Sequence, residues 1–334
     1  MRLHASSWDR NLEEQVFKRL AETFLMRPLV ALNIVVAVAL AAFFVNSFDF
    51  SSAFKGVEWL WVLPAIAFYL LLNIISAWRL RWLAGKFSGK CVSFSRAFWL
   101  HMGGMTLSDY TPGRAGYVLV ALKAQDLGLQ QKRVGGRVLG ISLASDFLVR
   151  GFFAVAAALL LVSALHSQAV LYAGAFLLLL SMAVLWACWR RNQFAVKILR
   201  LLPSGERLAS AYETVFEKGV AKRVLAKSVL LSVAGAFVRG AEWMLLAKAL
   251  GVSEIGFGAL GVFTAFNAVL TALSFVPLSI AGIGLQEGAG ALLFAAALGV
   301  ALPSAAALMI LVRVVESGTD LIGLRLFLPS RIPR

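Results

Sequence analysis

The segment Thr271–Gly290, TALSFVPLSIAGIGLQEGAG, contains the break in apolar sequence that most strongly indicates the fold. An apolar run stops at Pro277, passes through Gly282 and Gly284, and resumes in a short apolar helix that begins near Glu287. An unpaired backbone amide in lipid costs several kcal/mol, so a non-helical break at membrane depth survives only where protein or a water-filled cavity covers it. Discontinuous helices of this kind form binding sites in transporters.

A second break of the same kind, SDYTPGRAG at 108–116, lies in the first half of the chain. Pro112 and Gly113 interrupt an apolar run there, and Arg114 follows directly. The two breaks together predict an integral membrane protein that holds a lipid head group where two broken helices meet.

The composition is that of a membrane protein. Hydrophobic residues make up 60% of the 334 residues and charged residues 15%, against roughly 45–50% and 25% in soluble domains. Several apolar windows reach or approach the length of about 18 residues that a bilayer span requires. The net charge of +15 is spread between apolar runs and does not form one patch with interleaved aromatic residues, which argues against nucleic-acid binding. The sequence therefore predicts an all-α polytopic membrane protein.

Basic residues between the apolar runs set the predicted topology through the positive-inside rule. The N-terminus and the basic segment 79–96 are expected to face the cytosol, and 46–58 the outside. Residues 97–122 have basic residues on both sides and are too few for two crossings of about 20 residues each. This segment is therefore predicted to enter and leave on the cytosolic side, as a re-entrant pair of half-helices with Pro112 and Gly113 at the tip.

The second half of the chain is predicted to repeat this order in the opposite orientation. The hairpin at 256–298 carries Glu287 as its only charge, so it is expected to enter from the outer face. The expected elements are, in chain order, an interfacial cytosolic helix or a partly ordered tail at 1–27, crossings at 28–45 and 59–78, the hairpin 97–122, crossings at 138–165 and 169–188, the cytosolic amphipathic segment 189–228, a crossing at 229–249, the hairpin 256–298, a crossing at 304–328 and a cytosolic tail at 329–334.

Six spanning helices and two re-entrant helical hairpins are thus predicted to form inverted-topology repeats at 28–165 and 166–328. Repeats of this sort place substrate sites near the midplane of the membrane, where the two repeats meet. Both termini are expected to be cytosolic, in the cytoplasmic (inner) membrane.

Ten acidic or basic residues lie inside the predicted spans and hairpins, away from their ends. Each costs about 2.5–3.5 kcal/mol at the centre of a bilayer, so they are expected to face the protein interior. They are Asp109, Arg114, Asp146, Arg150, Arg239, Glu242, Glu287, Arg313, Glu316 and Asp320. Spacings of three or four residues place several of them on one helical face, where they can pair within the helix. Structural ion pairs that hold a helix bundle together are the alternative to a shared binding cavity.

Arg114 and Glu287 are the strongest candidates, because each lies at the start of a half-helix. Helix N-termini carry about half a positive charge and free amides, so two that converge form an anion site. The planar fork of Arg114 suits a phosphate, while Glu287 is expected to pair with an arginine, carry a proton or cap its helix. The predicted substrate-binding residues are Arg114, Pro112, Gly113, Gly116, Gly282, Gly284, Glu287, Arg313, Glu316, Arg239, Glu242, Asp146 and Arg150, and the candidates for proton or ion coupling are Glu287, Glu316 and Asp320.

Two motifs resemble the lysylphosphatidylglycerol synthase transmembrane-region family. VPLSIAGIGLQEGAGALLFAAALGV followed by LMILVRVVE is similar to the family's pattern at Pro277, Gly282, Gly284, Glu287 and Arg313, and TPGRAGYVLVALKAQDLG is similar to its Pro-x-Arg-x-Gly-Glu segment at Pro112, Arg114 and Gly116. The chain departs from this segment at Tyr117, where an acid is usual. The resemblance covers most of 28–328 and implies translocation of a phospholipid or other lipid-linked head group across a bacterial or archaeal cytoplasmic membrane.

The sequence therefore predicts a lipid flippase whose ligand is a phospholipid, a glycolipid or a polyprenyl phosphate. A non-transporting membrane subunit that binds lipid and recruits a cytosolic lipid-modifying enzyme or glycosyltransferase through 189–228 is the alternative, and any such enzyme would act in trans. No nucleophile elbow, paired metal ligands or nucleotide motif occurs, so no catalytic residue, metal or cofactor is expected.

Overall fold

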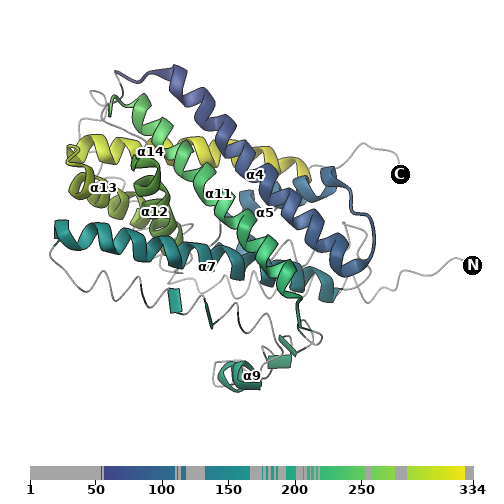
Figure 1. Cartoon of the computed structure of the whole chain (residues 1–334). Coiled ribbons are helices and arrows are strands. Elements are labelled where there is room, and N and C mark those ends of the chain that lie inside the picture. The colour runs from purple at the N-terminus through teal and green to yellow at the C-terminus, as the bar shows by residue number, and fades with distance from the viewer. Residues whose placement is uncertain are drawn as a thin grey trace, which may run out of the picture.

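The computed structural model describes residues 54, 56–109, 111, 114–117, 132–165, 193–200, 219–252, 258–274 and 284–327, together with isolated residues between 175 and 216. Every element that it defines in these ranges is helical (Figure 1), which confirms the predicted all-α class. The predicted elements 1–27, 28–45 and 329–334 lie outside the described residues, and so do most of 169–188 and the tip residues Pro112, Gly113 and Gly282.

The helices are, in chain order, α4 (Trp59–Ser88), α5 (Phe94–Asp109), the 3₁₀ helix η1 (Ala115–Tyr117), α7 (Lys132–Leu165), α9 (Gln193–Arg200), α11 (Lys222–Ala249), α12 (Gly258–Leu273), α13 (Leu285–Leu298), α14 (Leu302–Asp320) and the 3₁₀ helix η3 (Leu321–Leu326).

Helix length separates the described elements into two groups. The helices α4, α7 and α11 are long and apolar enough to cross a membrane. By contrast, α5 and α12 have 16 residues each and α13 has 14. At 1.5 Å per residue these three reach only about 21–24 Å, which is less than the hydrocarbon core of about 30 Å.

Two helices differ from the predicted bounds in a way that matters for the site. The first is α4, which does not stop before Arg79 but continues to Ser88, where Gly89 in the left-handed conformation (φ 67°) ends it. The second is α11, which begins at Lys222, inside the segment 189–228 that was expected to lie along the interface. Both helices extend beyond the predicted apolar run, α4 past its end at 78 and α11 before its start at 229.

The bundle is organised around α4 and α11, which run side by side through its middle (Figure 1). Each carries a shorter helix, α5 against α4 and α12 against α11. The long helix α7 contacts α4, α11 and α12, while α14 contacts α4, α5 and α11 and packs along α13. The short helix α9 lies apart from this bundle.

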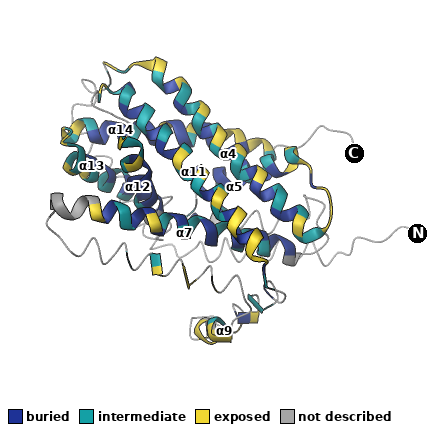
Figure 2. Ribbon diagram, in the orientation of Figure 1, coloured by how far each residue is buried: buried dark blue, intermediate teal, exposed yellow. Residues whose placement is uncertain are grey.

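The core consists of two apolar clusters. One joins α11 to α12, α13 and α14 around Trp243 and Phe294, and the other joins α4, α5 and α7 around Leu83, Leu100 and Ile141. Figure 2 shows exposed residues along the outward faces of the long helices, and many of these are large and apolar, including Leu60, Leu63, Phe152, Leu230 and Val314. Apolar side chains on the outside of a bundle are expected where lipid surrounds the protein, and the polar groups of this protein lie between its helices.

Candidate functional site

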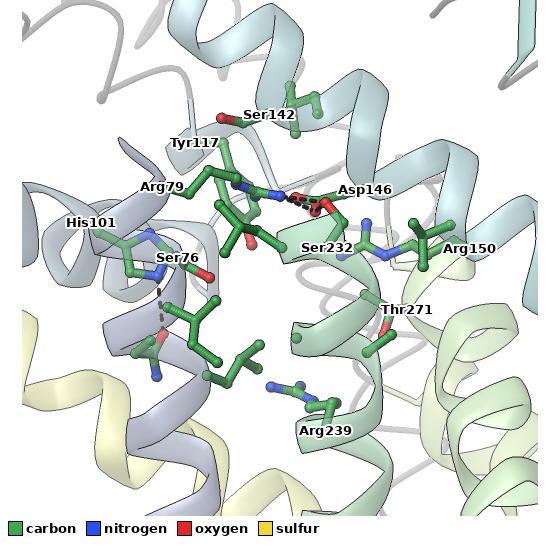
Figure 3. Close-up of a pocket in the computed structure, with 18 of the residues that line it drawn as sticks. Ser76, Arg79, His101, Tyr117, Ser142, Asp146, Arg150, Ser232, Arg239 and Thr271 are labelled. Atoms are coloured by element: carbon green, nitrogen blue, oxygen red, sulfur yellow. Dashed lines mark hydrogen bonds and ion pairs between the residues drawn. The ribbon is translucent and has the colours of Figure 1, made fainter. Parts of the chain in front are cut away.

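A cavity of about 130 Å³ lies between α4, α5, α7, α11 and α12 (Figure 3). A water molecule needs about 10–15 Å³ of such a cavity, so this one has room for several waters or for a compact polar group. Four predicted site residues lie on its wall: Arg114, Asp146, Arg150 and Arg239. The remaining polar lining is Asn73, Ser76, Arg79, His101, Tyr117, Ser142, Ser232, Asn267 and Thr271.

Arg79 is a cavity residue that the sequence reasoning assigned to the cytosolic end of a span. That assignment is wrong, because the Arg79 side chain is buried inside the helix bundle. Its guanidinium binds Asp146 of α7 with two parallel hydrogen bonds of 2.7 Å, Nη1 to Oδ1 and Nη2 to Oδ2. Ser232 of α11 donates to the same Oδ1 at 2.7 Å and contacts Arg79 Nη1. A signal was present in the sequence, since Asn73, Ser76 and Arg79 recur every three residues on one face of an apolar helix.

Arg114 is held in position by the way the first break folds. It has a φ of 54°, and it is the one residue other than glycine with a positive φ in the part of the chain that the structure describes. Its backbone N–H donates to the Thr111 carbonyl at 3.2 Å, and the Gly116 N–H donates to the Thr111 hydroxyl at 2.9 Å. A Cβ on Gly116 would come within 2.2 Å of the Ser108 nitrogen in α5, so no larger residue fits. The break is therefore folded tightly against the end of α5.

The Arg114 side chain is buried, with 4% of its surface exposed, and it lines the cavity. Its Nε has no hydrogen-bond partner. A buried cationic donor without a partner is costly, and an anion in the cavity would supply one.

Arg239 lies at the junction between the cavity and a buried group of acids. Its Nη2 contacts Glu316 of α14, and its Nε is 3.6 Å from Glu242 Oε2 one turn along α11. Its guanidinium lies over the Tyr69 ring of α4, 4.8 Å from the centroid. The Tyr69 hydroxyl in turn donates to Asp320 Oδ2 at 2.8 Å. Of these residues only Arg239 lines the cavity; Glu242, Glu316 and Asp320 lie behind it.

The second break brings Glu287 and Arg313 together. Glu287 Oε2 accepts from the Gly284 N–H at 2.6 Å, and its Oε1 accepts from Arg313 Nε at 2.7 Å. Two of the three expected roles of Glu287 therefore occur at once, since it caps its own helix and pairs with an arginine.

The two breaks do not share the cavity in the way that the sequence reasoning expected. Arg114 of the first break lines it, whereas Gly284, Glu287 and Arg313 do not. The connection between the breaks is Asp109, at the end of α5, which lies close enough to interact electrostatically with both Arg114 and Arg313. His101 is a hydrogen-bonded interior histidine, with Nε2 3.0 Å from Asn73 Oδ1.

Comparison with known proteins identifies the family of this chain. A family model described as "Lysylphosphatidylglycerol synthase TM region" matches residues 30–320, which is most of the chain. No curated protein matches this chain. The apolar helices and the family both indicate a multi-pass membrane protein, and the family further indicates a role in lipid handling. The chain belongs to the lysylphosphatidylglycerol synthase TM region family.

Proposed function

We propose that this protein is a lipid flippase, which moves a phospholipid or another lipid-linked anionic head group across the cytoplasmic membrane. The observation that carries the proposal is the cavity with four arginines on its wall: Arg79, Arg114, Arg150 and Arg239. Asp146 is the only acid among the described lining residues, and Arg79 already binds both of its oxygens. A head-group phosphate is a suitable ligand for guanidinium groups held in a concave site, because the planar fork of arginine matches phosphate geometry.

Contacts between helices support two inverted repeats around this cavity. The repeat hypothesis makes α4 equivalent to α11, α5 to α12 and α7 to α14. If each helix is replaced by its equivalent in the other repeat, every substantial contact between two of these six helices corresponds to another contact that is also observed. For example, α4 against α7 becomes α11 against α14, and α7 against α12 becomes α14 against α5.

Two buried ion pairs occupy equivalent places in this scheme. Arg79 of α4 pairs with Asp146 of α7, and Arg239 of α11 pairs with Glu316 of α14. Asp146 and Glu316 are each the fifteenth residue of their helix. A side chain from the other half joins each pair, since Ser232 of α11 donates to Asp146 and Tyr69 of α4 lies beneath Arg239. Each pair therefore holds two helices of one repeat together, and Ser232 and Tyr69 connect it to the repeat that would move against it if access alternates between the two faces of the membrane.

In the proposed cycle the head group enters the cavity while its acyl or prenyl chains stay in the bilayer. The short helices α5, α12 and α13 serve as parts of re-entrant hairpins within six spanning helices, with both termini cytosolic. Transport is passive or coupled to an ion or proton gradient, and the protein performs no covalent chemistry.

Reconstitution tests the proposal directly. The purified protein is placed in vesicles of phosphatidylcholine and phosphatidylglycerol that contain a trace of phosphatidylglycerol labelled on an acyl chain. A membrane-impermeant reductant then reports how much label reaches the outer leaflet. We expect faster exchange than in protein-free vesicles, and a rate at least about tenfold lower in Arg114→Ala, because a charged hydrogen bond contributes about 1.5–3 kcal/mol.

Arg325→Ala is the matched control for this experiment. Arg325 is exposed and stacks on Trp99 outside the cavity, so its loss should leave the exchange rate unchanged. An Arg114→Ala protein that exchanges lipid at the wild-type rate would refute the assignment of this site. Wild-type protein that exchanges no faster than empty vesicles would contradict flippase activity toward this lipid.

One observation favours the alternative of a lipid-binding subunit that recruits an enzyme. The helix α9, which lies apart from the bundle, exposes Phe194 and Ile198 beside Lys197 and Arg200. Such a surface suits either the membrane interface or a partner protein. Copurification of a lipid-modifying enzyme that is lost when 189–200 is deleted, with no lipid exchange by the protein alone, would favour this function.

A further inference from the structure

Glu242 is the buried acid whose surroundings do not account for a negative charge. It lies on α11 with none of its surface exposed, and neither carboxylate oxygen has a hydrogen-bond partner. Its nearest cation is Arg239, whose Nε is 3.6 Å away. An ionised carboxylate in the interior of a membrane protein normally accepts hydrogen bonds or pairs closely with a cation.

Arg239 cannot neutralise Glu242 and Glu316 together. Glu316 takes the better position, because it contacts Arg239 Nη2 and also accepts a 3.0 Å hydrogen bond from Trp243 Nε1. Two carboxylates that share one guanidinium repel each other, and protonation of one of them relieves the repulsion. Glu242 makes the fewer contacts and is the carboxyl that holds the proton.

The other helices that pack against α11 do not change this balance. From α14, Asp320 adds a third carboxyl near Glu242, while Arg313 lies near Glu316 but is bound by Glu287. From α4, Tyr69 presents a hydroxyl that donates to Asp320. The described residues of α12 include no titratable side chain. From α7, Asp146 is bound to Arg79, and Arg150 faces the cavity.

We infer that Glu242 is a proton-binding site, and that its proton is exchanged when α11 and α14 move apart. This inference rests on the proposed transport function and supplies its coupling ion. If α14 moves away and takes Glu316 with it, Arg239 keeps Glu242 as a neighbour on its own helix. Glu242 then forms the ion pair with Arg239 and releases its proton. When the helices close again, Glu316 reclaims Arg239 and Glu242 takes up a proton.

Infrared spectroscopy of the purified protein tests the proton site without any lipid ligand. A protonated carboxyl has a carbonyl stretching band that an ionised carboxylate lacks. At neutral pH we expect the wild-type spectrum to contain such a band that is missing in Glu242→Gln. The control is Glu287→Gln, which should leave the band in place because Glu287 is bound by Arg313 and by the Gly284 N–H. Identical acid bands in the wild type and Glu242→Gln would overturn the inference.

A pH gradient tests the coupling in the same labelled-phosphatidylglycerol vesicles. In the wild type, a gradient imposed across the membrane should change the steady distribution of label between the leaflets. The structure places Glu242 behind the cavity and not on its wall, so the predicted substrate-binding role of this residue is not supported. Glutamine resembles a permanently protonated glutamate, so Glu242→Gln should still equilibrate the label but lose the response to the gradient. Glu58→Gln, at the outer start of α4, should keep both properties.

The two measurements separate failure of the inference from failure of the proposed function. If Glu242→Gln responds to the pH gradient as the wild type does, the coupling role is refuted although transport stands. If the wild type does not move the label but the acid band disappears in Glu242→Gln, the proton site stands and the proposed transport of this lipid fails.

Discussion

Single charged residues are buried in the interior of this apolar helix bundle, among them Arg79, Arg239 and Glu242. The Arg79–Asp146 pair has two parallel hydrogen bonds of 2.7 Å, and Ser232 adds a third donor to Asp146. Removing one member of a buried pair leaves the other charge without a partner, which is far more costly than removing both. Such a pair specifies how α4, α7 and α11 fit together.

We predict that Arg79→Ala lowers the free energy of unfolding by about 3–5 kcal/mol, because Asp146 loses the partner that compensates its charge. The double variant Arg79→Ala/Asp146→Ala should recover much of that loss. Unfolding of the purified proteins in detergent measures both changes. Losses that simply add in the double variant would show that the two residues stabilise the fold independently.

At the scale of elements, close helix contacts depend on glycine. Gly240 of α11 faces α12 so closely that a Cβ there would lie 2.1 Å from the Thr264 hydroxyl and 3.0 Å from the Thr264 nitrogen. Small residues at such positions allow helix backbones to approach closely in membrane proteins. The contact fixes α12, and with it the cavity residues Asn267 and Thr271.

We expect Gly240→Ala to destabilise the protein by about 1–3 kcal/mol, since the added methyl forces the helices apart. Gly261→Ala in α12 is the matched control, because nothing lies within 4 Å of its Cβ position. That control should be neutral or stabilising by up to about 1 kcal/mol. The midpoint of thermal unfolding distinguishes them, and equal midpoints for the two variants would refute the close-contact argument.

Sequence patterns predict these elements well where they depend on local chemistry. The short helices α5, α12 and α13 follow from apolar runs that stop at Pro112 and Pro277, and the capping role of Glu287 follows from its place three residues after Gly284. The half-helix predicted after Arg114 lies, beyond Tyr117, outside the described residues. Arg79 could not be placed in this way. The positive-inside rule counts charges near the ends of apolar runs, whereas the depth of Arg79 is set by Asp146, which lies on a helix far away in the sequence.

For the whole molecule, the arrangement of repeats makes a prediction about sidedness. In a protein without its native cysteines, Ala301→Cys should react with a membrane-impermeant maleimide in intact cells, because 299–303 is expected outside. In a second protein, which keeps Cys91 and lacks Cys188, the exposed Cys91 in the basic segment after α4 should react only in inverted vesicles. Labelling of both positions from the same side would contradict inverted repeats.

The two equivalent ion pairs, Arg79–Asp146 in the first half and Arg239–Glu316 in the second, have a thermodynamic consequence. If opening toward the cytosol breaks one pair and opening toward the outside breaks the other, the two open forms differ little in free energy. Neither is then strongly disfavoured, and net flux follows whichever leaflet is richer in the lipid, unless an unequal proton supply on the two sides reverses it.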